Sequence, residues 1–204
     1  GSSFSGNNAL FNTLFGKNAG TSITTGDNNT AVGSGALTNS TTGDSNIAIG
    51  LNALQSNTTA ENNVAVGTEA MIGNQTGQNN VGVGRNALRN NTTADNNTAI
   101  GATALFANTT GSENVAVGAN ALDANTTASF NTAVGRDALN VNTTGDQNTA
   151  LGRSALNANT TASNNTAVGY NSLFSNTTGT QNTTLGRASL FSNTTASNNT
   201  AMGY

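Results

Sequence analysis

The stretch NTALGRSALNANTTASN, residues 148–164, decides the fold because close copies of it fill almost the whole chain. A glycine recurs every 17 residues, and an asparagine stands four residues before each of these glycines. The glycines are Gly16, Gly33, Gly50, Gly67, Gly84, Gly101, Gly118, Gly135, Gly152, Gly169, Gly186 and Gly203, and the asparagines are Asn12, Asn29, Asn46, Asn63, Asn80, Asn97, Asn114, Asn131, Asn148, Asn165, Asn182 and Asn199. A period held this strictly indicates one small unit stacked in a row, not a globular domain.

Each repeat predicts a short strand and a return. In Val64-Ala65-Val66 and Ile47-Ala48-Ile49, large and small apolar residues alternate with the period of a strand that has one buried face. The Ala-Leu pair after the glycine predicts a second extended stretch, so each coil offers one Leu, one Val or Ile and two alanines to the interior. Asn-Thr-Thr followed by Gly or Ala predicts the return turn.

These features favour an all-β fold, a parallel β-solenoid (β-roll) of about twelve 17-residue coils. A helix–turn repeat is the alternative, but Gly, Asn and Thr fill about half of each unit and leave no adequate helical run. Like residues then stack about 4.8 Å apart along the axis. We expect the asparagines from Asn29 to Asn182 and the glycines from Gly33 to Gly101 to form structural ladders, with amide-to-amide hydrogen bonds between the asparagines.

The chain reads as a single repeat domain, 1–204. For residues 1–15 we predict an irregular N-terminal coil or cap. Gly6 and Gly16 are only ten residues apart, which is shorter than the period of 17, and Phe4, Phe11 and Phe15 lie close together in this segment. Residues 16–204 predict regular coils. The C-terminus stops in phase without a polar cap, which fits either a fragment of a longer protein or copies that dock end to end in a filament.

Composition narrows the function classes. The net charge is −3, only 7% of residues are charged, and histidine and cysteine are absent. Six scattered cations do not form a phosphate track, so we expect no nucleic-acid partner. No apolar run is long enough to cross a membrane. Without histidine or cysteine, catalytic triads and most transition-metal sites are not expected, so we predict no enzyme activity and no cofactor. The thin core of each coil favours packing against copies of the chain, end to end or laterally.

The strings at 46–50, 62–67 and 97–101 resemble the head repeats of YadA-like trimeric autotransporter adhesins. Residues 165–179, NTAVGYNSLFSNTTG, look more like repeats in phage-type tail-fibre-domain proteins. The resemblance implies a left-handed β-roll, commonly trimeric, displayed at the cell surface or on a virion and used for attachment. On that basis we expect an extracellular structural protein, the shaft or adhesive surface of a fibre, filament or trimeric appendage, with a host-surface or matrix glycan or protein as a further partner.

One candidate contact surface consists of cations and aromatic residues that share columns. The position after the glycine holds Lys17, Arg85, Arg136, Arg153 and Arg187, with Tyr170 and Tyr204; a column beyond the leucine holds Phe106, Phe174 and Phe191. Exposed stripes of Arg and aromatic residues are typical of contact surfaces. The candidates are Phe106, Phe174, Phe191, Arg136, Arg153, Arg187 and Tyr170; packing against a neighbouring chain or plain solubility remains the alternative.

A threonine rank supports a second function, an ice-binding (antifreeze) β-solenoid. Its members are Thr25, Thr42, Thr59, Thr76, Thr93, Thr110, Thr127, Thr144, Thr161, Thr178 and Thr195. The two threonines of each Thr-Thr pair face opposite ways, so one rank faces out.

Two further patterns each have two interpretations. Asn57, Asn108 and Asn142 head Asn-Thr-Thr sequences, so they are either glycan acceptors or parts of a structural turn. The acids of one turn column, such as Asp27 and Asp44, either bind calcium between coils or are solvated turn residues.

Overall fold

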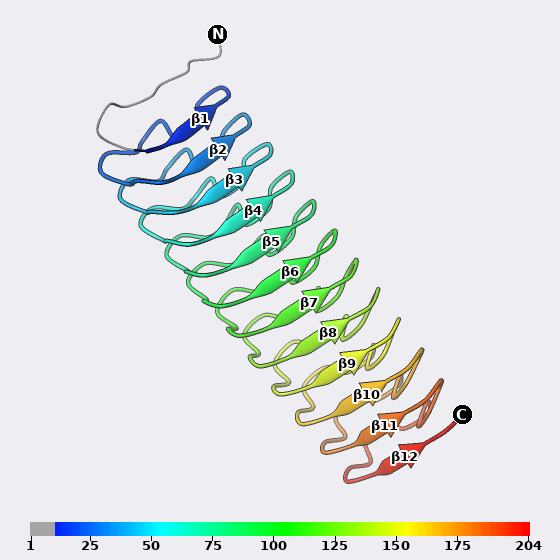
Figure 1. Cartoon of the computed structure of the whole chain (residues 1–204). Helices are drawn as coiled ribbons and strands as arrows, with labels where there is room; N and C mark the ends of the chain where they lie inside the picture. Colours follow the sequence, from blue (N-terminus) through cyan, green and yellow to red (C-terminus); the bar gives the residue numbers. More distant parts are fainter. Residues whose placement is uncertain (1–10) are drawn as a thin grey trace.

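The computed structural model describes residues 11–204, which form one rod of stacked coils carrying a parallel sheet (Figure 1). The strands are β1 (Thr13–Phe15), β2 (Thr30–Val32), β3 (Ile47–Ile49), β4 (Val64–Val66), β5 (Val81–Val83), β6 (Thr98–Ile100), β7 (Val115–Val117), β8 (Thr132–Val134), β9 (Thr149–Leu151), β10 (Thr166–Val168), β11 (Thr183–Leu185) and β12 (Thr200–Met202). Each strand pairs in parallel with its neighbours in the sequence, and Ala48, for example, lies opposite Ala65. The predicted parallel β-solenoid is therefore confirmed.

The return half of each coil differs from the prediction, because the Ala-Leu pair does not start a second strand. Leu54, Leu88 and Leu105 have φ values of 50°, 50° and 51°, in the left-handed region. That conformation costs an L-residue about 1–2 kcal/mol. Full burial of each leucine side chain and a hydrogen bond between coils, such as Leu54 N–H to the Ala70 carbonyl at 3.1 Å, offset this cost. The return half is therefore a run of turns that is bonded along the axis.

The core is narrower than predicted, because the large strand residues point outward. In β4, Ala65 is fully buried, whereas Val64 and Val66 on either side of it are only half-buried. The interior consists of the strand alanine together with the alanine and leucine of the return half. Since the leucine reaches across the coil, the inner strand position has room only for a small side chain.

In two places, a departure from this pattern at one interior position is matched by a glycine at the position that faces it. Met71 replaces the leucine of its coil, and in the next strand Gly82 replaces the alanine; a Cβ on Gly82 would lie 2.8 Å from Met71 Cγ. In the first coil Leu14 stands at the alanine position and Gly20 at the leucine position, and a Cβ on Gly20 would lie 2.6 Å from Leu14 Cδ2. The interior volume is thus kept nearly constant along the rod.

The predicted irregular segment 1–15 lies mostly outside the described residues, Phe4 included. Its last three residues, Thr13–Phe15, form β1 and pair in register with β2. The regular stack therefore already includes residues that precede Gly16.

The asparagine column runs through the interior and bonds to the backbone as well as to itself. Asn46 Nδ2 donates to the Ala60 carbonyl at 2.8 Å, which closes the coil, and more weakly to Asn29 Oδ1 at 3.2 Å. Asn29 Oδ1 also accepts the Asn46 backbone N–H at 2.9 Å. The predicted amide-to-amide contact is the longest of the three, so the column acts chiefly by satisfying buried backbone groups.

The glycine column marks a close approach of neighbouring coils. Gly101 has φ 137°, and a Cβ there would lie 2.5 Å from the Gly118 carbonyl oxygen. Any other L-residue would be strained and would also clash at this position.

Candidate functional site

The outward side of the sheet is the most extended feature of the surface. We call it the strand face. Its first column is Thr13, Thr30, Ile47, Val64, Val81, Thr98, Val115, Thr132, Thr149, Thr166, Thr183 and Thr200; its second is Phe15, Val32, Ile49, Val66, Val83, Ile100, Val117, Val134, Leu151, Val168, Leu185 and Met202. Every one of these side chains is half-buried or exposed, and none is charged. From the strand spacing, the face is about 50 Å long and two side-chain columns wide, on the order of 500 Å².

Sequence reasoning missed this face because it assigned the Val and Ile residues to the core. A signal was present in the strands themselves: the middle residue is alanine in nine of the twelve strands, whereas the flanking residues vary among Thr, Val, Ile, Leu, Phe and Met. A narrow interior restricts side-chain size, and an outward position does not.

The threonine rank, defined above as Thr25 through Thr195, is exposed along its whole length. The preceding threonine of each pair differs, because its hydroxyl donates to the next coil, as Thr109 Oγ1 does to the Thr126 carbonyl at 3.0 Å. One rank therefore faces solvent, and the other holds coils together.

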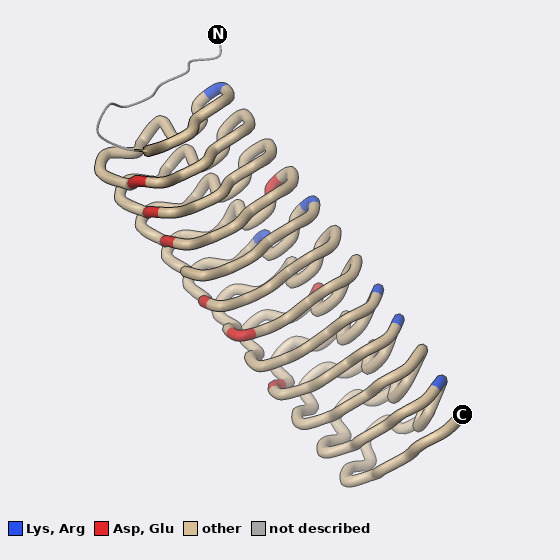
Figure 2. Tube along the Cα trace, viewed as in Figure 1, with Lys and Arg blue, Asp and Glu red and all other residues tan. Residues whose placement is uncertain are grey.

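Charges separate to two edges of the rod (Figure 2). Lys17 and four arginines follow the strands at one edge, and most acids precede the strands at the other. Acids of the column that includes Asp27 and Asp44 bond to the backbone of the previous coil: Asp44 Oδ1 accepts the Asp27 N–H at 2.6 Å. Ser112 and Ser129 do the same with their hydroxyls, at 3.2 and 3.0 Å. Among residues 11–204 no three acidic side chains gather where they could hold a metal ion. The Asp and Ser side chains of this column therefore accept hydrogen bonds from backbone N–H groups of the previous coil.

The predicted contact residues fall into separate groups. Arg153 and Arg187 lie on either side of Tyr170, each with its guanidinium carbon 5.8 Å from the ring centroid. Phe174 and Phe191 stack at 5.2 Å with an interplanar angle of 5°.

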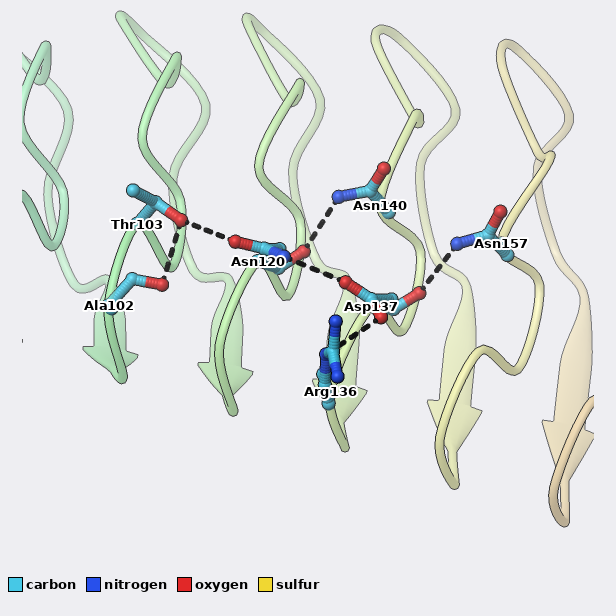
Figure 3. Close-up of polar contacts among 7 residues, drawn as sticks. All are labelled: Ala102, Thr103, Asn120, Arg136, Asp137, Asn140 and Asn157. Atoms are coloured by element: carbon cyan, nitrogen blue, oxygen red, sulfur yellow. Dashed lines mark hydrogen bonds and ion pairs between the residues drawn. The ribbon is translucent and has the colours of Figure 1, made fainter.

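Phe106 lies away from both groups and instead packs under Arg89 at 5.7 Å. Arg136 is paired with Asp137, Nε to Oδ2 at 3.1 Å, in a polar ladder that continues through Asn120 to Thr103 (Figure 3). Asn140 and Asn157 reach this ladder from the column in which Phe174 and Phe191 stand further along the rod.

The three glycan candidates are buried in a second asparagine column. Asn57, Asn108 and Asn142 are fully buried, and Asn108 Nδ2 donates to the Gly111 carbonyl at 2.9 Å and to Asn91 Oδ1 at 3.0 Å. A glycan on that nitrogen does not fit inside this coil, so the structural-turn interpretation agrees with the geometry.

One carboxyl group is perturbed. Partial burial of Asp123 raises its pKa above the ordinary value of 3.8. Asp123 is the one acidic residue at its position in the coils, so its column does not place a second carboxyl group above or below it.

No family model, curated protein or solved structure matches this chain. Within residues 11–204, no helix has the length and hydropathy needed to span a bilayer.

Proposed function

We propose that the chain is a non-enzymatic structural rod that associates laterally with copies of itself through the strand face. In this proposal it forms the shaft or adhesive surface of a fibre, filament or trimeric appendage outside the cell or on a virion. The resemblance to adhesin head and tail-fibre repeats belongs to the same proposal.

The observation that carries it is the uncharged strand face. Eight of its 24 residues are threonine and the rest are apolar, so roughly 300 Å² of the face is apolar, at the lower end of the range for the largest apolar patches on ordinary monomers, which usually mark interaction sites. Two copies pairing through it would bury about 1,000 Å² in total, near the lower limit for a specific interface. A second copy is the occupant that matches the face over its whole length, because both partners repeat at the same spacing.

The test is the mass of the protein in solution, measured by sedimentation and light scattering. Lysine at Val83 and Val117, in β5 and β7, places two charges in the strand face without touching the core. The matched control places lysine at Thr76 and Thr110 of the threonine rank, two coils apart in the same way. We expect an oligomer for the parent and the control and a monomer for Val83→Lys/Val117→Lys, with unchanged circular dichroism. A monomeric parent at tens of micromolar overturns the proposal.

Ice binding is the second candidate, and the exposed threonine rank favours it. Its eleven members recur once per coil on a rigid rod, and no hydrogen bond engages their hydroxyls among the described residues. Thermal hysteresis of the purified protein tests it directly. We expect Thr110→Lys/Thr127→Lys to abolish hysteresis and the strand-face variant to retain it; absence of hysteresis in the parent eliminates this candidate.

A further inference from the structure

The last third of the cation edge has an unusual charge environment. Beyond Asp146 the sequence contains Arg153 and Arg187 but no acidic residue. The ion pairs within residues 11–204 join Arg89 to Glu69 and Arg136 to Asp137, so neither Arg153 nor Arg187 is neutralised. A protein of net charge −3 therefore carries a local charge of +2 on one edge.

Tyr170 orders these two cations. Arg153 comes from the coil before it and Arg187 from the coil after it, and each guanidinium lies 5.8 Å from the ring centroid. The two charges are thus held two coils apart, about 10 Å along the axis. Arg187 also lies 5.3 Å from the Tyr204 ring. Because the aromatic rings already restrict these side chains, the two arginines lose less conformational entropy when they bind a ligand.

Exposed aromatic area borders the cations. Phe174 and Phe191 stand four residues after Tyr170 and Arg187, and their rings stack at 5.2 Å. Phe191 is 40% exposed and Tyr170 42% exposed, so the edge combines fixed charge with apolar surface.

We infer that Arg153, Tyr170 and Arg187, which we call the arginine–tyrosine ladder, bind a linear acidic polysaccharide bearing carboxylate or sulfate groups. Guanidinium groups pair with such oxyanions through two parallel hydrogen bonds. A single row of charge along the rod suits an extended polymer that lies parallel to the axis. This inference deepens the adhesive part of the proposed function and rests on it.

The geometry disfavours single-stranded nucleic acid as the polyanion. Bases bind such proteins by stacking on open aromatic faces. Within the ladder itself, arginines lie on both sides of Tyr170, and the open ring surface lies beside it, on Phe191 (40% exposed) and Tyr204 (90% exposed). The ladder therefore offers charge and the phenol hydroxyl, which suit a sugar oxyanion better than a base.

The test is affinity electrophoresis in gels containing polygalacturonate or dextran sulfate, with neutral dextran as the blank, at about 50 mM salt, where exposed charges are only partly screened. The variant is Arg153→Gln/Arg187→Gln. Its matched control, Lys17→Gln/Arg85→Gln, removes the same charge from the same column, away from Tyr170. Tyr170→Leu removes the ordering ring but keeps both cations.

We expect retardation of the parent by an acidic polysaccharide, a loss of about tenfold in affinity for Arg153→Gln/Arg187→Gln, a smaller loss for Tyr170→Leu and none for the control. Equal losses in the variant and the control would reduce the effect to net charge and overturn the inference. Stronger binding to single-stranded DNA or to phosphatidylserine vesicles would also overturn it.

Sedimentation of the same proteins separates this inference from the proposed assembly. If the parent is monomeric and binds polysaccharide, the ladder inference holds and lateral assembly is refuted. If the parent is an oligomer that binds no acidic polysaccharide, lateral assembly holds and the ladder inference is refuted.

Discussion

Removing one asparagine from the interior column tests what holds the coils together. Asn114 is fully buried, and its side chain makes three hydrogen bonds. Its Nδ2 donates to the Ala128 carbonyl at 2.8 Å and to Asn97 Oδ1 at 3.2 Å, and its Oδ1 accepts the Asn131 backbone N–H at 3.0 Å. Asn114→Ala removes all three bonds and leaves a small cavity.

The substitution affects the three hydrogen-bond partners of Asn114 differently. The Ala128 carbonyl keeps a second donor, Asn125 Nδ2 at 3.0 Å, and Asn97 Oδ1 still accepts the backbone N–H of residue 114. Only the Asn131 N–H is left buried without an acceptor, which costs about 1–3 kcal/mol. With the two weaker losses and the cavity, we expect a destabilisation of about 3 kcal/mol.

The second asparagine column supplies a comparison. Asn108→Ala removes the donor to Asn91 Oδ1 and one of the two acceptors of Asn125 Nδ2, which keeps the Ala128 carbonyl, but it leaves every backbone N–H paired. The structure already contains one such acceptor, since Asn57 Oδ1 is buried without a partner. We therefore expect Asn108→Ala to destabilise the rod by less than Asn114→Ala.

Urea unfolding followed by circular dichroism gives the change in the free energy of unfolding, and hydrogen exchange at the Asn131 amide locates it. Local measurement matters because a stacked repeat is stabilised mainly by neighbouring coils. Thr110→Ala, in the exposed threonine rank, is the control and should change stability by less than about 0.5 kcal/mol. If Asn114→Ala is no worse than this control, the backbone-satisfying role of the column is refuted.

Three further changes test other parts of the coil. Gly101→Ala should destabilise by at least about 3 kcal/mol, because φ is 137° and the new Cβ meets the Gly118 carbonyl; a normal thermal melt would contradict this. Phe130→Asn should stabilise by about 0.5–1 kcal/mol in urea unfolding, because Phe130 is 53% exposed at φ 61°, a conformation that asparagine tolerates better. Asp123→Asn should raise the melting temperature at pH 7. Burial raises the folded-state pKa of Asp123 above 3.8, so the ionised carboxylate destabilises the folded parent at pH 7. This cost shrinks as the pH falls through the folded-state pKa, and the advantage of the variant should be gone below pH 3.8.

The strand half of each coil was predictable because its signal is local. The alternation around Ala65 and the glycine after it indicate a strand and a tight approach without reference to any other coil. The return half was not, since Leu54 has no intrinsic preference for the left-handed region and adopts it only where a buried site and an acceptor on the next coil compensate. The same reason explains the missed strand face: which side of β4 lies inward depends on how far the leucine reaches across the coil.

The sequence by itself determined the period, the parallel stacking and the columns of asparagine, glycine and leucine, because identical units in a row have to place like residues over one another. Tertiary structure decided what each column does. It turned the Asp and Ser column into caps for the previous coil, buried Asn108 rather than exposing it, and placed Arg153 and Arg187 on the two faces of Tyr170. These outcomes depend on contacts between residues about 17 positions apart, whose direction across the coil is fixed only once the backbone has closed.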